Sequence, residues 1–343
     1  MTKTSTIKDV AKQAAVSIAT VSFVLNERSG QSISEAVRRR VLRAARDLHY
    51  HPNAAAADLA RKRTNNVAII FYKEEELIAN AFYSFVVQGA IKQAIDREYN
   101  LLFSYIGKTY GGVSDLPKVI REKNAQGALF INRVNPRLLR DIQARGIPVV
   151  AIDHYPQVPE VNSLEIDNSY GGSQAAEHLV KLGHVRLAFL RAAAAQRPSI
   201  AERGRGFARV LERHDLKTSG TVIEAHSLSF EGAHDKAYAV LRSKRRPTAL
   251  FCANDEMAAG VLRAAYELGV GVPDELSVVG FDDIPMSNFS DPPLTTVSVV
   301  KEHLGRRAMT RLLELVEGTD REVKHENVTV QLVVRGSTAR PKS

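Results

Sequence analysis

Few residues of this 343-residue chain combine the type and the spacing that covalent or metal chemistry needs. Cys252 is the single cysteine, which excludes an internal disulfide and disfavours a zinc cluster. His178 and His184 are six residues apart, a spacing that suits neither adjacent helical turns nor a usual zinc motif, so we interpret both as structural. Asp282 and Asp283 are neighbours at the end of an expected strand, where they point apart and make a poor acid–base pair. The sequence therefore predicts no enzyme, no metal site and no cofactor.

The positive charge of the chain is concentrated at its N-terminus. The formal net charge is +9, of which residues 1–64 contribute +7. Because basic residues neutralise phosphates, this asymmetry indicates an attached nucleic-acid-binding module, with a solvated basic tail as the alternative. The length favours two or three domains. The N-terminus lacks the apolar core of a signal peptide, and no apolar run is long enough to span a bilayer, so we expect a cytoplasmic protein.

The first 50 residues are patterned as three short helices rather than as a tail. Thr6 can cap the first helix, a turn follows at 15–17, and Ser17 can cap the second. The third helix begins at Ser34. A three-residue turn between the first two helices is typical of a helix-turn-helix unit. The expected apolar positions are Ile7, Val10, Ala11 and Ala14, then Val21, Val24 and Leu25, then Val37, Val41, Leu42, Ala45 and Leu48.

The second of these helices is the expected DNA-reading helix. Thr20 and Ser22 suit phosphate contacts, which position a protein on DNA without reading its sequence. Ile18, Ala19 and Phe23 offer no hydrogen bond to a base edge, so their available readout is apolar contact with thymine methyl groups. The alternative is that one of them, Ile18 first, packs partly against the third helix.

From Asn66 onward, short apolar runs alternate with helical stretches. This alternation predicts βαβ units and parallel sheets with helices on both faces, in more units than one sheet accommodates. We therefore expect two doubly wound lobes with a cleft between them. Gly171-Gly172 opens a helix without Walker or G-x-G-x-x-G surroundings, so phosphate binding there is only weakly indicated. The expected strands are NNVAIIFY, NLLFSYI, QGALFIN, IPVVAID, VRLAFL, TALFCAN and LSVVGFD.

Several of these runs together resemble the LacI/GalR family of bacterial transcription regulators. TIKDVAKQAAVSIATVSFVLN is similar to the family's headpiece, and SISEAVRRRVLRAARDLHYHPNAAAADLARKRTN to its third helix and hinge. Asp167–Gly171, HLVKLGH, CANDEMAAG, GVPDELSVVGFDD, DPPLTTV and VVRGST resemble its core, which is in turn similar to periplasmic sugar-binding proteins. The resemblance implies a headpiece at 1–51, a hinge helix and linker at 52–64, and an effector-binding and dimerisation core at 65–343. The expected N-lobe spans about 65–165 and 295–323, and the expected C-lobe about 166–294 and 324–338.

The resemblance also implies how DNA is bound. In the family, hinge helices form on operator DNA, and a leucine from each is wedged into the minor groove; Leu59 matches that leucine. Two positions depart from the family pattern. Ala15 replaces the turn glycine and tolerates a left-handed turn less well. Ala57 replaces a hinge arginine, and Asp58 adds a negative charge beside the groove. The expected DNA-binding residues are Thr6, Ser17, Ile18, Ala19, Thr20, Ser22, Phe23, Asn26, Asn53, Ala56 and Leu59.

The effector pocket is carried over from the family by position. Phe82 and Tyr83 match its aromatic stacking positions, with ordinary core packing as the alternative. Arg203 fits its R-x-x-G-F element, and Asp282 matches an acidic residue that accepts hydrogen bonds from the ligand. Asp255 either contacts the ligand or serves as a structural cap. The full expected set is Phe82, Tyr83, Arg197, Ser199, Arg203, Phe230, Asn254, Asp255 and Asp282.

The resulting prediction is a repressor whose affinity for a near-palindromic operator is set by a small effector. We expect a sugar or sugar derivative as the effector; a purine or another metabolite is the alternative, and a solute-binding protein is a remote one. The tail GSTARPKS after Arg335 is too short for a heptad-patterned tetramer helix, so we expect a homodimer.

Overall fold

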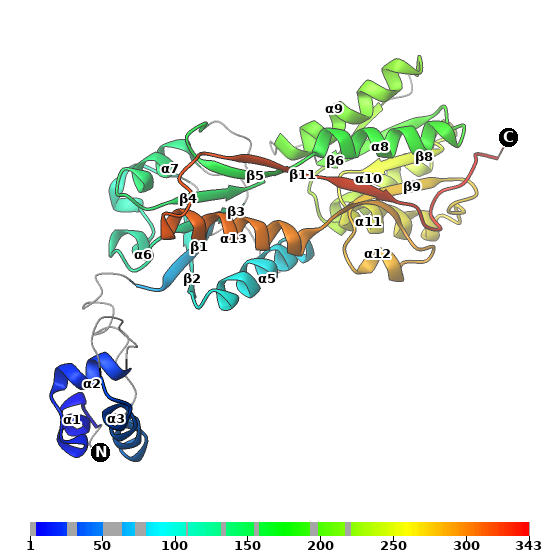
Figure 1. Cartoon of the computed structure of the whole chain (residues 1–343). Coiled ribbons are helices and arrows are strands. Elements are labelled where there is room, and N and C mark those ends of the chain that lie inside the picture. The colour runs from blue at the N-terminus through cyan, green and yellow to red at the C-terminus, as the bar shows by residue number, and fades with distance from the viewer. Residues whose placement is uncertain are drawn as a thin grey trace. The chain divides into compact units, whose positions relative to one another are not determined.

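The structure is a computed structural model that describes residues 5–25, 33–50, 64–72, 80–107, 109–131, 135–153, 158–192, 198–216 and 221–342. The chain divides into two compact units, Met1–Asn65 and Asn66–Ser343. Figure 1 shows the described part of the first unit as a group of helices and the second unit as two α/β lobes. The expected linker at 52–64 lies almost entirely outside the described residues. Among those residues, no helix has the length and apolar character needed to cross a membrane.

The headpiece consists of α1 (Ile7–Ala14), α2 (Ile18–Leu25) and α3 (Glu35–Asp47), as predicted. Val10, Val21 and Val41, one from each helix, are fully buried against one another's helices and form the centre of its core. The predicted stripe of α3 is wrong at Leu42, which is 40% exposed, while Ala44 is buried. Helical periodicity of 3.6 residues places 41, 44, 45 and 48 on one face and turns position 42 outward.

The N-lobe is a six-stranded parallel sheet with the strand order β11-β5-β4-β3-β1-β2. Helices α5 and α13 pack on one face, and α6 and α7 contact β2 and β4 through a second apolar cluster. Its elements are β1 (Asn66–Tyr72), α5 (Ala81–Asp96), β2 (Asn100–Ile106), α6 (Lys118–Arg121), β3 (Ala128–Ile131), α7 (Pro136–Gln143), β4 (Val149–Ile152), β5 (Asn162–Ile166), α13 (Lys301–Glu317) and β11 (His325–Val328).

The C-lobe repeats this architecture with the order β12-β10-β9-β8-β6-β7, in which only β12 is antiparallel to its neighbour. The predicted doubly wound α/β fold is confirmed for both lobes. The elements of the C-lobe are α8 (Asn168–Lys181), β6 (Leu187–Ala192), α9 (Pro198–Arg213), β7 (Thr221–Ala225), α10 (Phe230–Leu241), β8 (Ala249–Cys252), α11 (Asp255–Glu267), β9 (Ser277–Asp282), α12 (Met286–Phe289), β10 (Thr295–Val299) and β12 (Val330–Val333).

The chain crosses between the lobes three times, and each crossing is a single residue between two regular elements. Asp167 joins β5 to α8, Val300 joins β10 to α13, and Thr329 joins β11 to β12. These positions correct the expected lobe limits. The expected N-lobe includes 295–323 and the expected C-lobe 324–338, but β10 (Thr295–Val299) pairs in the C-lobe sheet and β11 (His325–Val328) in the N-lobe sheet. The short runs TTVSV and HENV look alike as strands in the sequence, and neither shows which sheet it joins.

The N-lobe helices α5 and α13 meet backbone to backbone. A Cβ on Gly89 would lie 2.0 Å from the carbonyl oxygen of Glu302, and one on Gly305 would lie 1.8 Å from that of Val86. No other residue type fits at either position without separating the helices. The two glycines therefore set how closely α5, which begins with the predicted aromatic pair, lies against α13.

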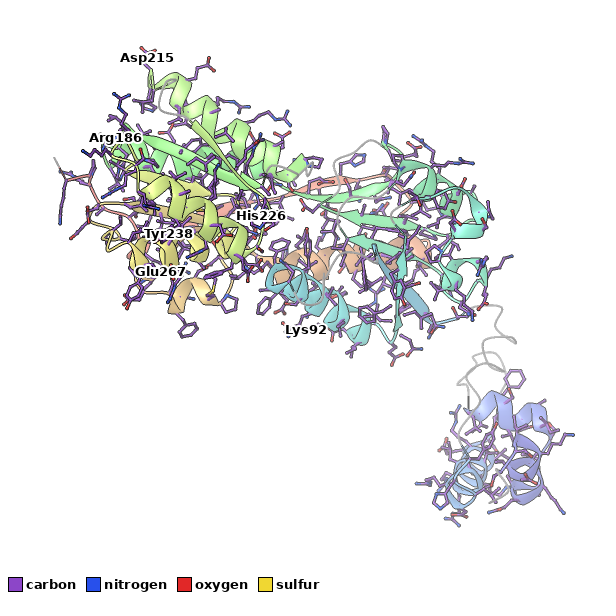
Figure 2. All side chains as sticks on the ribbon, turned by 180° about the vertical axis from the view of Figure 1, so that it is seen from behind. Lys92, Arg186, Asp215, His226, Tyr238 and Glu267 are labelled. Atoms are coloured by element: carbon purple, nitrogen blue, oxygen red, sulfur yellow. The ribbon has the colours of Figure 1, made fainter. Side chains whose placement is uncertain are left out.

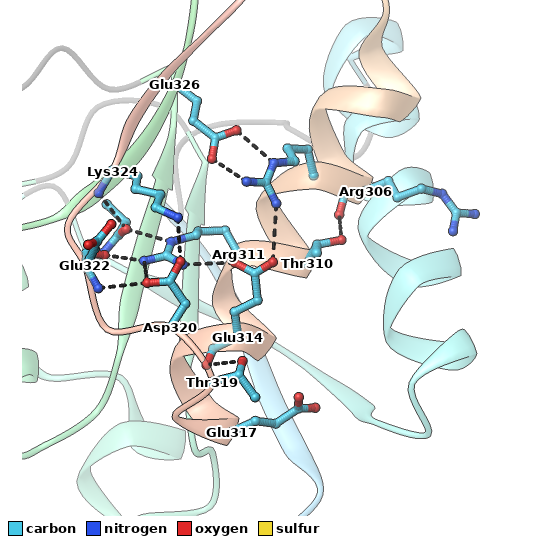
Figure 3. A network of polar contacts seen from close by, with 12 residues as sticks. Arg306, Thr310, Arg311, Glu314, Glu317, Thr319, Asp320, Glu322, Lys324 and Glu326 are labelled. Carbon is cyan, nitrogen blue, oxygen red and sulfur yellow. Dashed lines mark hydrogen bonds and ion pairs between the residues drawn. The ribbon is translucent and has the colours of Figure 1, made fainter.

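A buried arginine holds the end of α13 against the N-lobe sheet. Arg311 is fully buried, and its guanidinium pairs with Glu314 and Asp320, each at 2.9 Å. Its Nε donates to the side-chain oxygen of Asn162 at the start of β5, also at 2.9 Å, and another nitrogen donates to the Glu322 carbonyl (Figure 3). Because every buried charge needs a partner, this network fixes the segment between α13 and β11.

Candidate functional site

The expected DNA-reading helix, α2, exposes apolar side chains in its first turn. Ser17 caps α2 by accepting a hydrogen bond from the Thr20 backbone N–H at 3.0 Å, and the two hydroxyls lie 2.9 Å apart. Ile18 is 45% exposed, which argues against its burial under α3. Ala19 is also exposed, and Phe23 is half-buried. The N-terminal turn of α2 thus combines exposed apolar side chains with two hydroxyls, of Ser17 and Thr20, that lie within hydrogen-bond distance of each other.

Two features of the headpiece hold this helix in place. Asp9 accepts hydrogen bonds from the Thr6 backbone N–H at 2.8 Å and from its hydroxyl at 2.7 Å, which caps α1. Ala15 adopts the left-handed conformation, with φ 52° and ψ 51°, as the turn after α1 requires. Ser22 is half-buried on α2. The other predicted DNA-binding residues, Asn26, Asn53, Ala56 and Leu59, lie outside the described residues.

Arg203 is the centre of the candidate effector site. It lies on α9, is 6% exposed, and its Nε donates to the side-chain oxygen of Asn168 at 2.8 Å. Its other nitrogens donate to the Ala253 carbonyl and, at 3.4 Å, to the Asp282 carboxylate. The guanidinium carbon sits 3.6 Å above the ring of Phe281, within the range of a cation–π contact. The structure therefore brings the predicted arginine and carboxylate together at the carboxyl edge of the C-lobe sheet.

Two glycines allow α8 and α9 to pack backbone to backbone, and this close contact places Arg203 beside α8. A Cβ on Gly172 would lie 2.0 Å from the Arg203 carbonyl oxygen, and one on Gly206 would lie 1.8 Å from that of Ser169. The two helices are in backbone contact at these points, so Arg203 reaches Asn168 on the neighbouring helix. Gly172 therefore has a packing role between α8 and α9.

Asp282 ends β9 with a positive φ of 110° and is 8% exposed. Burial raises the pKa of its carboxyl group to about 7, although Arg203 acts in the opposite direction. Lys301, at the start of α13, donates to the carbonyl oxygen of Asp283 at 2.8 Å and to that of Asp282. Asp283 itself pairs with Arg335 at 2.6 Å, so the two aspartates do point to different partners. A carboxyl group with a pKa near neutrality can both donate and accept a hydrogen bond.

Asp255 is held by the C-lobe itself. This fully buried carboxylate accepts hydrogen bonds from the Ile284 backbone N–H at 2.9 Å, the Ser287 hydroxyl at 2.7 Å and the Thr296 hydroxyl at 2.5 Å. These contacts favour the structural interpretation over a ligand contact. Asn254 likewise caps α11 by accepting from the Met257 N–H at 2.9 Å.

The N-lobe side of the site begins at Asn80. Its side-chain oxygen caps α5 by accepting from the backbone N–H groups of Phe82 and Tyr83 at 3.0 and 3.2 Å. Its amide nitrogen donates across to Glu256 on the C-lobe helix α11 at 3.3 Å. Phe82 and Tyr83 are each 6% exposed and pack edge to face. The helix-cap signal of Asn80 is visible in the sequence, but its bond to the other lobe is not.

The remaining predicted effector residues differ in their surroundings. Ser199 is buried on α9, one helical turn before Arg203 and on the same face. Phe230 is 39% exposed and stacks on His234, with ring centroids 6.3 Å apart. Arg197 lies outside the described residues.

The free energy of unfolding of the core should depend on pH because of the buried Asp282. Its pKa of about 7 in the folded state exceeds the value of about 3.9 in an unfolded chain. The folded state then binds more protons, so this contribution is fully present below pH ~4 and is lost as pH rises towards 7. We expect the difference in unfolding free energy between wild type and Asp282→Asn to fall across this window, by up to about 1.4 kcal/mol per pH unit.

Denaturant unfolding of the full chain from pH 4 to 8 measures this difference. Comparison with the variant is needed because burial lowers the pKa values of His178 and His184, which change stability in the opposite direction. A difference that stays constant with pH would contradict the assignment to Asp282.

Among the described residues, no group of three or more histidine, cysteine or acidic side chains could hold a metal ion. His178 lies 2.9 Å from the Thr338 hydroxyl, and the buried His184 lies 2.9 Å from the Ala339 carbonyl. Both histidines therefore bind the C-terminal segment to the C-lobe, in line with their structural interpretation.

Comparison with known proteins agrees with this arrangement. Residues 6–53 match the family described as bacterial regulatory proteins, lacI family, and residues 176–338 match a periplasmic binding protein-like domain. The chain is 30% identical to the HTH-type transcriptional repressor PurR of Photobacterium profundum, over 97% of this chain and 98% of that protein. It is 33% identical to the PurR repressor of Aliivibrio fischeri, again over 97% and 98%.

Solved structures give the same result. A structure of the Lac repressor dimer bound to operator and the anti-inducer ONPF matches with a TM-score of 0.86 and 28% identity, over 98% of this chain and all of that one. A CelR–cellobiose complex matches with a TM-score of 0.67 and 26% identity, over 97% and 99%. The chain belongs to the LacI family of bacterial regulatory proteins, and it is a DNA-binding transcriptional repressor rather than an enzyme.

Proposed function

We propose that this repressor acts as a homodimer on a near-palindromic operator in the bacterial cytoplasm, and that a purine base bound at Arg203 and Asp282 sets its DNA affinity. The buried pair of these two side chains carries the proposal. It lies where the carboxyl ends of the C-lobe strands meet Lys301 at the start of α13, the usual place for a ligand in an open α/β sheet.

The chemistry of the pair supports a purine. Arg203 presents donors, while the carboxyl of Asp282 has a pKa of about 7 and can donate or accept. A purine edge alternates donors and acceptors in the same way. Phe82 and Tyr83 at the start of α5 match the family's aromatic stacking positions, but each is 6% exposed and they pack against each other, so the ligand class rests on the polar pair and on the relatives. The two PurR relatives at 30% and 33% identity point to the same ligand class.

A sugar is the second candidate, favoured by the cellobiose complex of the CelR structure at 26% identity. Calorimetric titration of the full chain with adenine, guanine and hypoxanthine, and in parallel with ribose, galactose and cellobiose, separates the two classes. We expect saturable binding of a purine base only. Binding of a sugar alone would overturn the ligand class, and binding of neither would overturn the site.

Effector binding should also change DNA binding. A duplex selected from a random pool by the full chain can be titrated with and without the bound base. Because coupling between two sites is reciprocal, the base and the duplex must change each other's affinity by the same factor. Equal affinity in both conditions would refute control by that effector.

We expect Leu59→Ala to weaken operator binding strongly, by roughly 10- to 100-fold, because a wedged side chain recovers the few kcal/mol that unstacking a base step costs. Leu59 lies outside the described residues, so this expectation rests on the hinge resemblance. Fluorescence anisotropy with the selected duplex measures it, and Leu48→Ala serves as a control for headpiece stability. Unchanged binding by Leu59→Ala would show that the hinge assignment is wrong.

A further inference from the structure

A second pocket opens at the amino edge of the C-lobe sheet, at the opposite ends of the strands from Arg203. It encloses about 320 Å³ and is formed by three loops that precede strands, together with the C-terminal segment. Figure 2 labels Arg186, just before β6, and His226, just after β7, at opposite ends of the C-lobe. The pocket is lined by Arg186, Lys244, Arg246, Thr248, Asp274, Glu275, Pro341 and Lys342.

The lining carries more positive charge than its own carboxylates neutralise. Arg246 pairs with Glu275 at 2.7 Å, and Lys342 pairs with Asp274 at 2.8 Å. These two pairs account for both acidic side chains of the pocket. The remaining cations are Arg186 and Lys244, and neither forms an ion pair with any of the described residues. The pocket therefore presents a net charge of +2 that no group in the described part of the chain balances.

The wall of the pocket is braced from behind by a buried histidine. His184 is 2% exposed, and its two ring nitrogens lie 3.0 Å from the Thr248 hydroxyl and 2.9 Å from the Ala339 carbonyl oxygen. The second nitrogen also lies 3.0 Å from the hydroxyl of the buried Ser277. Thr248 lines the pocket, and Ala339 comes two residues before the lining Pro341. This chain of hydrogen bonds fixes the C-terminal segment as one side of a preformed pocket.

Glu275 fixes another side. Its carboxylate accepts from the Gly271 backbone N–H at 3.0 Å while it pairs with Arg246. Arg246 is thereby held, and its carbonyl oxygen lies 3.4 Å from the Nε of Arg186. The two cations without an ion-pair partner among the described residues, Arg186 and Lys244, are exposed and lie on separate loops, before β6 and before β8.

We propose that this pocket is a second, separate ligand site for a small phosphorylated molecule. A phosphate monoester carries close to two negative charges at neutral pH, which matches the unbalanced charge of Arg186 and Lys244. Arginine and lysine together provide the fork and the point charge that phosphates bind. The volume suits a small metabolite. Asp274 and Glu275 at the same pocket would repel the extended backbone of a nucleic acid, so a compact anion fits better than DNA.

The test is isothermal titration of the full chain with inorganic phosphate and with pyrophosphate at low ionic strength. We expect saturable binding of pyrophosphate, and a loss of affinity of at least about 10-fold in the double variant Arg186→Ala/Lys244→Ala. The matched control is Arg245→Ala, which removes an exposed charge from the same loop but not from the pocket lining. Its affinity should fall much less than that of the double variant, because Arg245 contributes charge near the pocket but no contact within the lining.

Two results would overturn the proposal. One is that neither phosphate nor pyrophosphate binds saturably. The other is that Arg245→Ala and the double variant lose the same affinity for pyrophosphate, which would indicate only a general electrostatic attraction. Should the double variant fail to fold, Arg186→Gln and Lys244→Gln are measured singly, and each must weaken pyrophosphate binding more than Arg245→Ala. Purine titration of the same variants keeps this test separate from the effector site, since Arg186 and Lys244 lie at the other edge of the sheet.

Discussion

Replacing Arg203 with methionine is expected to lower the free energy of unfolding of the core by about 3–5 kcal/mol, the usual result of removing one partner of a buried charged pair. Methionine approximates the length of the side chain but removes every donor. Asn168, the Ala253 carbonyl and the Asp282 carboxyl would then lose the groups that satisfy them. The same change should abolish binding at the effector site, because the ligand would meet an unpaired carboxyl in place of a donor fork.

Denaturant unfolding of the full chain measures the loss, and calorimetric titration with the purine panel measures binding. Arg205→Met is the matched control, since Arg205 lies two residues along the same helix, and its exposed side chain pairs, among the described residues, only with Glu202. Exposed pairs contribute at most about 1 kcal/mol. Equal effects of the two substitutions would mean that Arg203 is not the centre of this site.

The second large effect is expected from one methyl group on Gly206. In Gly206→Ala, the added Cβ would lie 1.8 Å from the Ser169 carbonyl oxygen, and only separation of α8 and α9 relieves that contact. Overpacking of this kind costs about 1–3 kcal/mol and occasionally more. We expect the free energy of unfolding to fall by an amount near the top of this range. Effector binding should also weaken, because the contact between α8 and α9 positions Arg203.

Gly204→Ala is the control on the same helix, and it gains the same helix propensity of about 0.5–1 kcal/mol. Its Cβ would meet only the ring of Phe189, at 3.0 Å, which can give way by a few tenths of an ångström. Thermal and denaturant unfolding of both variants should therefore differ by about 2 kcal/mol or more. Similar stability of the two variants would show that α8 and α9 can separate freely.

Local sequence patterns predict much of this fold, because the spacing of apolar residues indicates which positions of a helix or strand are buried. The apolar runs at β1, β3, β4, β6, β8 and β9 are buried on both faces of a parallel sheet and stand out in the sequence. By contrast, the sequence pattern does not predict the strand β5. Its Asn162, Ser163 and Glu165 are polar yet buried. Their partners, such as Arg311 for Asn162, come from distant parts of the chain, so no local pattern shows why they are inside.

The candidate site shows the same limit. The family resemblance predicts Arg203 and Asp282, and the structure places them in contact. Sequence reasoning misses Asn168 and Lys301, because a single asparagine or lysine gives no signal until the fold brings it to the pair. Asp255 shows the opposite case, for which the sequence leaves a ligand contact and a structural cap both open. Its acidic type and position suggest a ligand contact, while its three hydrogen-bond donors are visible only in three dimensions.

The three single-residue crossings at Asp167, Val300 and Thr329 have a mechanical consequence. Each crossing offers only two soft backbone torsions, so the lobes can tilt against each other but have no slack with which to slide apart. The glycine-packed helix pairs on either side resist deformation, which leaves the crossings as the most compliant points of the core. An effector bound between the lobes, as proposed, would therefore act by changing the angle between them, and lengthening any crossing by one residue would weaken that coupling without touching the ligand.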